Sequence, residues 1–379
     1  MLDNNFITQI TTLRKSLHAN PELSGKEFQT QEKIIRFLTK ETNSVIEKIA
    51  HTGVIATFNG TSDGLTVMIR GDIDALPIIE TNDFKHRSII EGVSHKCGHD
   101  GHTAILLGLA LLLGKQNILK GKVILLFQPS EENGTGAKAV LEDIAFKNIK
   151  IDYAFALHNL PGYASDEIVI KDNEFSGNVK SIIIKLNGKT SHAAEPEKGN
   201  NPSLAIASLL QYAHKITLND VASKHFFLAT PIHVNMGELA YGVSAGFGEV
   251  HFTIRSWSGK IMEKKTKELV NYIHELCVSN QLQSEIIWTQ VFTETINHSK
   301  AVESIINAAN YNGYTITKRL YPFKWGEDFG LFTQKIKGAM FGLGAGLKTP
   351  ALHNPDYDFP DKILPAGINM FYQIIKSLN

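Results

Sequence analysis

Residues 95–102 read HKCGHDGH, which places one cysteine, one aspartate and three histidines in eight consecutive positions. Thiolate sulfur, imidazole nitrogen and carboxylate oxygen are the ligands of zinc and related divalent ions. Cys97 and His99 are two positions apart, and Gly98 between them lets the backbone bend enough for both side chains to converge. The segment is therefore a candidate catalytic metal site.

Three other roles compete for Cys97. A structural zinc site needs four protein ligands in paired spacing, and the only other cysteine is the distant Cys277. A redox thiol would normally have a C-x-x-C partner, which is missing here. A cysteine nucleophile needs a nearby histidine and an orienting group, both of which the segment could supply. That third role, however, leaves the carboxylates described next without a function.

Two adjacent glutamates, Glu131 and Glu132, come soon after the apolar run 122–127. One carboxylate can bind a metal ion while its neighbour accepts a proton from an activated water, which is general-base catalysis. An arbitrary pair of glutamates would be a solvated loop, but the position after a buried strand favours the catalytic interpretation. For other histidines, such as His18, we expect a surface position or a satisfied core position.

The elements that would position these side chains are four apolar runs, at 65–69, 122–127, 152–157 and 338–344. Such runs are typical of strands buried on both faces of an α/β sheet. In open α/β sheets the ligand site lies outside the carboxyl ends of the strands. The polar residues that follow these runs form a convergent acidic and imidazole cluster: Asp72, Asp74, Glu131, Glu132, His158 and His353.

The order strand, helix, strand, strand, helix, strand from about residue 176 to 290 predicts a ferredoxin-like domain. We therefore predict an α/β fold: a catalytic α/β domain with a mostly parallel sheet, formed by 1–175 and 291–379, and an inserted α+β domain at 176–290. Near the N-terminus, Ser24 and Glu27 have the spacing of a capping box and predict the start of the second helix.

Length and composition exclude several classes of protein. The 379 residues suit two domains. Lys plus Arg and Asp plus Glu are both 38, so no basic excess indicates nucleic-acid binding. Two cysteines form no disulfide framework and favour a reducing compartment. The N-terminus lacks a signal-peptide pattern, and the run 104–114 is shorter than the ~20 residues of a membrane span. We expect a cytoplasmic protein without membrane contact, and a buried helix at 104–114.

The ordered motifs of the chain resemble one known family: the dinuclear metallopeptidases and amidohydrolases that include aminoacylases and carboxypeptidase-G-type enzymes. Within it the chain is most similar to the N-acyl-amino-acid amidohydrolases, which include hippurate hydrolases and auxin-conjugate hydrolases. Each motif alone is weak, but their order along nearly the whole chain is specific. The motifs are LHANPELSGKEFQT, RGDIDALPI, HKCGHDGH, QPSEENGTGA, LHNLPG, SHAAEP, WGEDF and LHNPDYDFPD.

The resemblance implies two divalent metal ions, with manganese expected and zinc, cobalt or nickel as alternatives. Glu131 would be the general base, and Asp72 and Asp74 would orient the ligands. The implied activity is hydrolysis of the amide bond of an N-acyl amino acid by metal-activated water. A dipeptidase, an aminopeptidase or carboxypeptidase, and a catalytically silent binding protein for a small acid stay open as alternatives. The implied metal ligands are Cys97, His99, Glu132, His158 and His353.

The inserted domain would correspond to the lid of the family, which also implies homodimerisation. His192 in SHAAEP matches a histidine that approaches the reacting carbonyl or the carboxylate of the substrate. The alternative interpretation is that His192 is a polar loop residue without a catalytic role. Arg255 is a weaker candidate for carboxylate recognition, because an arginine on a strand can simply face solvent.

The chain departs from the usual pattern of the group at four places, and no predicted ligand is affected. Residues 242–245 read GVSA where NVIP is usual, and Asn201 replaces an aspartate. Trp325 and Gly326 stand where Gly-Ser is usual, and Lys96 replaces an alanine. The departures put the substrate specificity within the group in doubt, and make dimerisation less secure.

Overall fold

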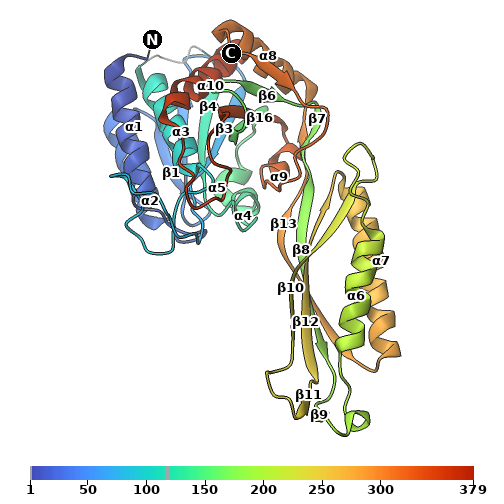
Figure 1. The fold of residues 1–379 in the computed structure, drawn as a ribbon. Helices are drawn as coiled ribbons and strands as arrows, with labels where there is room; N and C mark the ends of the chain where they lie inside the picture. Colours follow the sequence, from blue (N-terminus) through green and yellow to red (C-terminus); the bar gives the residue numbers. More distant parts are fainter. Residues whose placement is uncertain (1, 116–119) are drawn as a thin grey trace. The chain divides into compact units, whose positions relative to one another are not determined.

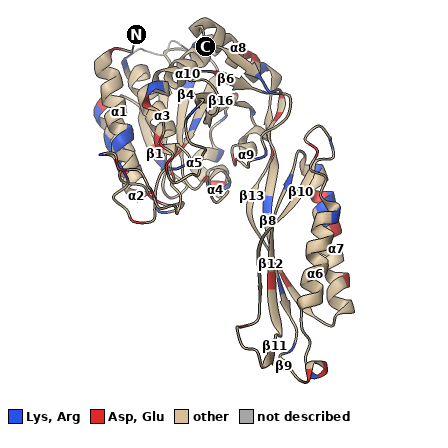
Figure 2. Ribbon diagram, in the orientation of Figure 1, with Lys and Arg blue, Asp and Glu red and all other residues tan. Residues whose placement is uncertain are grey.

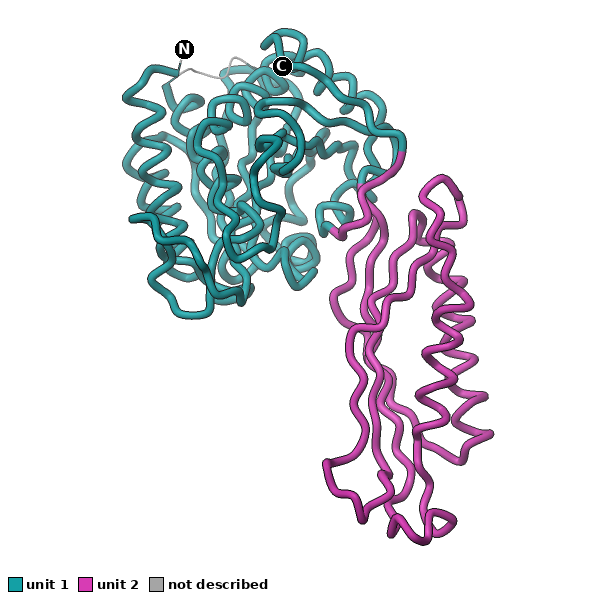
Figure 3. Tube along the Cα trace, in the orientation of Figure 1, with its two compact units in different colours: residues 1–175, 295–320, 327–379 teal, residues 176–294, 321–326 magenta. Residues whose placement is uncertain are grey.

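The structure is a computed structural model, and it describes residues 2–115 and 120–379. The chain divides into two compact units, which Figure 3 colours separately. Unit 2 begins at Ser176 and also includes Tyr321–Gly326, a segment that the sequence analysis assigned to the catalytic domain. The two units are Met1–Phe175 with Thr295–Leu320 and Glu327–Asn379, and Ser176–Glu294 with Tyr321–Gly326.

Unit 1 is built on an eight-stranded sheet with the order β1-β2-β4-β3-β5-β16-β6-β15. Its central strands β4, β3, β5 and β16 run parallel, while β1, β2 and the pair β16–β6 are antiparallel. The strands are β1 (Val45–Ile49), β2 (Gly53–Asn59), β3 (Thr66–Asp72), β4 (Lys122–Gln128), β5 (Tyr153–Pro161), β6 (Ile168–Ile170), β15 (Ile316–Lys318) and β16 (Lys337–Gly346).

Helices pack on this sheet, as Figure 1 shows. Helix α3 is buried along nearly its whole length, because 104–113 is continuously apolar and gives it no polar face. This confirms the predicted buried helix. The helices of unit 1 are α1 (Asn4–His18), α2 (Phe28–Glu41), α3 (His99–Lys115), α4 (Gly136–Glu142), α5 (Ile144–Lys147), α8 (Ser299–Asn312), α9 (Gly330–Thr333) and α10 (Leu364–Leu378).

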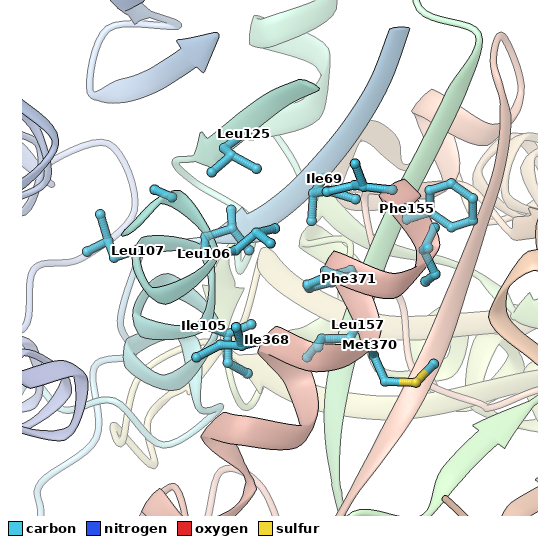
Figure 4. Close-up of a cluster of buried hydrophobic side chains, with 14 of the residues drawn as sticks. Ile69, Ile105, Leu106, Leu107, Leu125, Phe155, Leu157, Ile368, Met370 and Phe371 are labelled. Atoms are coloured by element: carbon cyan, nitrogen blue, oxygen red, sulfur yellow. The ribbon is translucent and has the colours of Figure 1, made fainter. Parts of the chain in front are cut away.

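The main core lies where α3 and α10 meet the sheet. Figure 4 shows Ile105 of α3 beside Ile368 of α10, and the strand residues Ile69 and Phe155 in another part of the same cluster. The helices approach closely at Gly108, where an added Cβ would lie 2.5 Å from the Ile368 side chain. The core therefore fixes the start of α3, which carries His99, relative to the carboxyl ends of the strands.

All four predicted strands of the sheet are present, and each extends by one or more residues at its C-terminal end. Two strand ends were predicted too early, and both matter for the site. Asp72 was expected after its strand but is the last residue of β3. His158 was expected after its strand, but β5 continues to Pro161, so His158 lies within it. The strand continues because β16 pairs with it beyond the apolar run, with Gly342 opposite His158.

The predicted capping box of α2 was wrong. The Ser24 hydroxyl donates to Asp74 at 2.7 Å, and does not cap the helix. The carboxylate of Glu22 accepts from the backbone N–H groups of Gln29 and Thr30 instead. The partner of Ser24 is the buried carboxylate of Asp74, 50 positions along the chain, and local sequence spacing cannot predict such a tertiary contact.

Unit 2 is a four-stranded antiparallel sheet with the order β10-β12-β8-β13, accompanied by two helices. Its element order confirms the predicted ferredoxin-like α+β pattern. Helix α7 carries charges of both signs (Figure 2). The sequence analysis did not foresee two short paired strands, β9 (Ser191–His192) and β11 (Val243–Ser244). The larger elements are β8 (Asn178–Asn187), α6 (Ser203–Ile216), β10 (Phe227–Met236), β12 (Phe247–Ser256), α7 (Gly259–Ser279) and β13 (Gln283–Phe292).

A two-stranded pair of β7 (Asn173–Ser176) and β14 (Thr295–Asn297) lies where the chain passes between the units. Among the described residues, no helix combines the length and apolar character needed to cross a membrane.

Candidate metal centre and active site

The HKCGHDGH segment places Cys97 just before α3 and His99 as the first residue of that helix. Gly98 between them has φ of +95°, and a Cβ there would lie 2.5 Å from the Asn159 side chain. Only glycine fits both requirements. The potential ligand atoms of Cys97, His99 and His158 consequently lie within 4.8 Å of one another.

The turn after β4 brings the two glutamates to the same place. Ligand atoms of Cys97, Glu132 and His353 form one group within 4.8 Å, and those of His99, Glu131 and Glu132 form another. His353 approaches from the loop after β16 with φ of +66°, an uncommon conformation for a residue with a Cβ. The structure thus brings together all five predicted ligands and the predicted base.

Hydrogen bonds orient the imidazole rings toward the centre of this cluster. His99 Nδ1 lies 3.0 Å from the backbone oxygen of Asp74 and 3.2 Å from its carboxylate, so its Nε2 faces Glu132 at 3.7 Å. His158 Nδ1 lies 2.9 Å from the Asn159 carbonyl, and its Nε2 is 3.5 Å from Cys97 Sγ. Ligating histidines typically use one nitrogen in this way and present the other to the metal.

Two buried atoms in the cluster show that its donors suit a metal. His99 Nε2 and Glu132 Oε1 are shielded from solvent and have no hydrogen-bond partner. Buried polar atoms without a partner are rare, because each costs desolvation energy without compensation. A divalent ion binds nitrogen and oxygen atoms of this kind together with a thiolate. The residues present therefore fit a metal centre.

The electrostatics of the cluster also favour cations. Burial, together with Glu327 and Glu132, raises the pKa of Glu131 well above its usual value. Burial is the main cause that raises the pKa of Glu132 to about 7. Burial lowers the pKa of His158 to about 3, which keeps this ring neutral and able to bind a metal. These carboxylates repel one another in a poorly solvated site, and positive charge would relieve that repulsion.

One buried arginine organises the floor of the site. Arg70 on β3 bonds to Asp72 at 2.7 Å, to Glu327 at 2.9 Å and to Asp328 at 2.8 Å. Asp72 also accepts from the His102 ring. The sequence analysis did not single out Arg70, Glu327, Asp328 or His102, although all four lie within motifs that it quoted.

Lys96, one of the four departures, is fully buried. Its Nζ donates to Glu80 at 2.6 Å and to the Tyr357 carbonyl at 2.7 Å. Its own carbonyl accepts from the backbone N–H of His353 at 2.7 Å. The lysine therefore ties the loop that carries His353 to the segment that carries Cys97.

His192 belongs to unit 2, where it ends β9 and is exposed. The backbone N–H of Ala194 donates to its Nδ1 at 3.0 Å, so the neutral ring carries its proton on Nε2. Val243 in the GVSA segment pairs directly with His192. Asn201 donates to Ser244 Oγ at 3.2 Å, so two of the departures contact each other beside this histidine.

Arg255, also in unit 2, donates through Nη1 to the Lys324 carbonyl at 2.7 Å. Burial lowers the pKa of its guanidinium. Trp325 stacks on Phe323 with ring centroids 4.8 Å apart. A Cβ on Gly326 would lie 2.7 Å from the Phe292 ring, so this departure packs closely within the unit.

Residues 68–377 match the model of a family described as peptidase family M20/M25/M40. The chain belongs to this family. The match confirms the resemblance to the metallopeptidase and amidohydrolase family and the prediction that the chain is a hydrolase.

Similar proteins cover nearly all of this M20 chain. An N-acetyl-L-cysteine deacetylase of Bacillus subtilis is 31% identical over 98% of this chain and 88% of its own length. A hippurate hydrolase of Campylobacter jejuni is 27% identical over 96% of this chain and 94% of its own. A crystal structure described as a dinuclear metal binding peptidase of the M20 family from Bacillus subtilis superposes with a TM-score of 0.84, at 28% identity and 99% coverage of both chains.

Proposed function

We propose that this M20 hydrolase cleaves the amide bond of N-acyl amino acids with the help of two divalent metal ions. The observation that carries the proposal is that five candidate ligands and one further glutamate lie close together. Two of their atoms, His99 Nε2 and Glu132 Oε1, are buried without a hydrogen-bond partner. The names of two similar proteins, an N-acetylcysteine deacetylase and a hippurate hydrolase, support this substrate class. The similar dinuclear peptidase supports the number of metals.

The thiolate, the three imidazoles and one carboxylate would hold the metals, and manganese is the ion we propose, with zinc, cobalt and nickel as alternatives. When bound, divalent ions polarise a scissile carbonyl and lower the pKa of water from about 15.7 towards about 7. Asp74 would keep His99 in the required orientation through its hydrogen bonds to Nδ1. Asp72 would hold the side chains of Arg70 and His102 in place beneath the ligands, through its ion pair with Arg70 and its hydrogen bond to His102. The proposed ligands are Cys97, His99, Glu132, His158 and His353.

Glu131 would be the general base. Its carboxylate is buried and lies 4.0 Å from His99 Nε2, at the edge of the ligand cluster. It would take a proton from the attacking water and deliver that proton to the leaving amine. General acid–base catalysis of this kind contributes roughly 10²–10⁴-fold to the rate.

His192 would stabilise the negative charge that develops on the carbonyl oxygen of the substrate. The hydrogen bond from Ala194 to Nδ1 leaves Nε2–H as the donor, which is the tautomer that this role requires. Removing a single donor of this kind costs about 2.7–4 kcal/mol of transition-state stabilisation in other hydrolases. Arg255 would bind the carboxylate of the substrate, because its guanidinium has five N–H donors and the Lys324 carbonyl accepts from one of them, on Nη1.

We also propose a cytoplasmic location and a homodimer formed through the lid. Both cysteines are buried as free thiols, which suits a reducing compartment. β10 is an edge strand of the lid sheet and exposes Ile232, Val234 and Met236, which a second copy could cover.

The first test is amine release from N-acetyl amino acids, N-benzoyl amino acids and dipeptides, using metal-stripped protein with and without Mn²⁺. We expect Mn²⁺-dependent release from one of the two acyl classes. Release from dipeptides alone would make the protein a dipeptidase instead. No release from any substrate, with metal bound, would support the silent binding protein.

A second test separates the two adjacent glutamates. Glu131→Gln should retain two metal equivalents and lose roughly 10²–10⁴-fold in kcat. Glu132→Gln should lose metal as well as activity. Glu303→Gln, an exposed change on α8, should alter neither. Near-normal kcat in Glu131→Gln would rule out this residue as the base.

A further inference from the structure

A second cluster of potential metal ligands lies on the sheet of unit 2, away from its helices. Val250 and Phe252 on β12 are buried in the core of this unit, so Glu249 and His251, which alternate with them, face the opposite side of the sheet. His233 on the neighbouring strand β10 pairs directly with His251. Two histidines and one glutamate therefore share the open face.

An irregularity in the sheet brings His233 to this position. The register of β10 against β12 shifts between Pro231 and His233, which leaves Ile232 as an extra residue. A bulge of this kind changes which side chains of a strand face a given side, and bulges often re-aim functional residues. Here the shift sets His233 directly opposite His251.

Both histidine rings approach the same carboxylate oxygen of Glu249. His233 Nε2 lies 3.5 Å and His251 Nε2 lies 3.7 Å from the same carboxylate oxygen, Oε1 of Glu249. The two ring centroids are 4.9 Å apart. His251 Nε2 is shielded from solvent and has no hydrogen-bond partner. Lys185, which lies opposite Glu249 on β8, pairs with Glu285 at 3.2 Å.

These separations suit a transition-metal ion. With bonds of about 2.0–2.2 Å, two ligands of a tetrahedral zinc ion lie roughly 3.3–3.6 Å apart. Small side-chain rotations would bring both Nε2 atoms and the carboxylate to that spacing. The His233 side chain is 50% exposed, so an ion could enter from solvent and keep water as its fourth ligand.

We propose that His233, Glu249 and His251 form a binding site for one Zn²⁺ or similar transition-metal ion, separate from the proposed catalytic centre. The ion would cross-link β10, an edge strand paired only with β12 in this sheet, to its neighbour. Because the ion binds the folded sheet and not the unfolded chain, it would stabilise this unit in proportion to its affinity.

The test is equilibrium dialysis of the metal-loaded holoenzyme against Zn²⁺ at micromolar concentrations, with bound zinc and other metals counted by mass spectrometry. Wild type should bind one equivalent more than His233→Asn and His251→Asn, with roughly tenfold or greater loss of affinity in each variant. His225→Asn, an exposed histidine elsewhere in the same unit, should bind as wild type does.

Glu249→Gln provides a second variant in case a histidine change disturbs folding, and it should also weaken the additional equivalent. With zinc present the wild type should melt at a higher temperature, and this increase should be smaller in all three cluster variants. Equal zinc binding by wild type and every cluster variant would overturn the proposal. So would an equal loss in His225→Asn. Each comparison subtracts the metals of the catalytic centre, so the outcome does not depend on the proposed activity.

Discussion

The two units treat their charged side chains in opposite ways. In unit 1, Arg14, Arg70 and Lys96 are fully buried, and each contacts carboxylate groups or backbone oxygens from distant segments. In unit 2 the ion pairs of lysine with glutamate are partly or fully solvent-exposed, as for Lys185 with Glu285. The burial of interlocked charges holds the candidate ligands in one arrangement. No lysine or arginine among the described residues of unit 2 is buried in this way, and the sheet of this unit depends on the apolar core beneath it.

The largest expected effect comes from breaking the network around Arg70. Arg70→Met would leave Asp72, Glu327 and Asp328 buried without their cation, which should lower the free energy of unfolding by about 3–5 kcal/mol. Lys185→Met, the matched change in unit 2, should alter it by less than about 0.5 kcal/mol. Urea unfolding of both variants measures this contrast. Equal losses would show that the buried network does not distinguish the units.

A pH-dependent effect should follow at His18, which was expected to be a surface or satisfied core residue and is buried. Burial lowers the pKa of His18, but Asp100 and Glu80 outweigh burial and raise it from 6.5 to about 9. A raised pKa contributes stability that is complete below pH 6.5 and is lost as the pH rises through about 9. The shift corresponds to about 3 kcal/mol.

The measurement is the difference in unfolding free energy between wild type and His18→Gln across this pH range. The difference should be largest below pH 6.5 and should shrink by pH 9.5 or above. His225→Gln, on the exposed surface of unit 2, should give a difference that hardly changes with pH. A flat profile for His18→Gln would mean that this histidine is not charged in the folded protein.

The smallest effect should appear beside His192. Ser244→Ala removes the acceptor of the Asn201 hydrogen bond, which should cost about 1 kcal/mol or less of stability. Because β11 pairs with β9, the loss should also loosen His192 and lower kcat several-fold with little change in metal content. Ser208→Ala on α6, whose hydroxyl bonds only locally to Leu204, is the control. Unchanged kcat in Ser244→Ala would show that the hydrogen bond between Asn201 and Ser244 does not influence catalysis.

Much of the candidate site was predictable because it depends on local pattern. Apolar runs indicated the buried strands, and parallel strands place their carboxyl ends at one edge, so Glu131, Glu132 and His353 could be grouped from chain order. The position of His158 within β5 was not predictable in the same way. It depends on how far β16 continues to pair with that strand.

The sequence by itself determined the four central strands of the large sheet, the family and the six residues that the structure brings together as candidate ligands and base. The strands follow from residue type and periodicity, which act over a few positions, whereas the family and the six residues follow from the order of the motifs along nearly the whole chain. Only the tertiary structure decided which charges are buried together. Arg70 meets Asp328 across 258 positions, and Lys96 meets Tyr357 across 261. The tertiary structure also decided that Ser24 bonds to Asp74 and does not cap a helix. It likewise placed His233 opposite His251, through a shift in strand register. Such pairings are set by sheet register and packing, which no local spacing encodes.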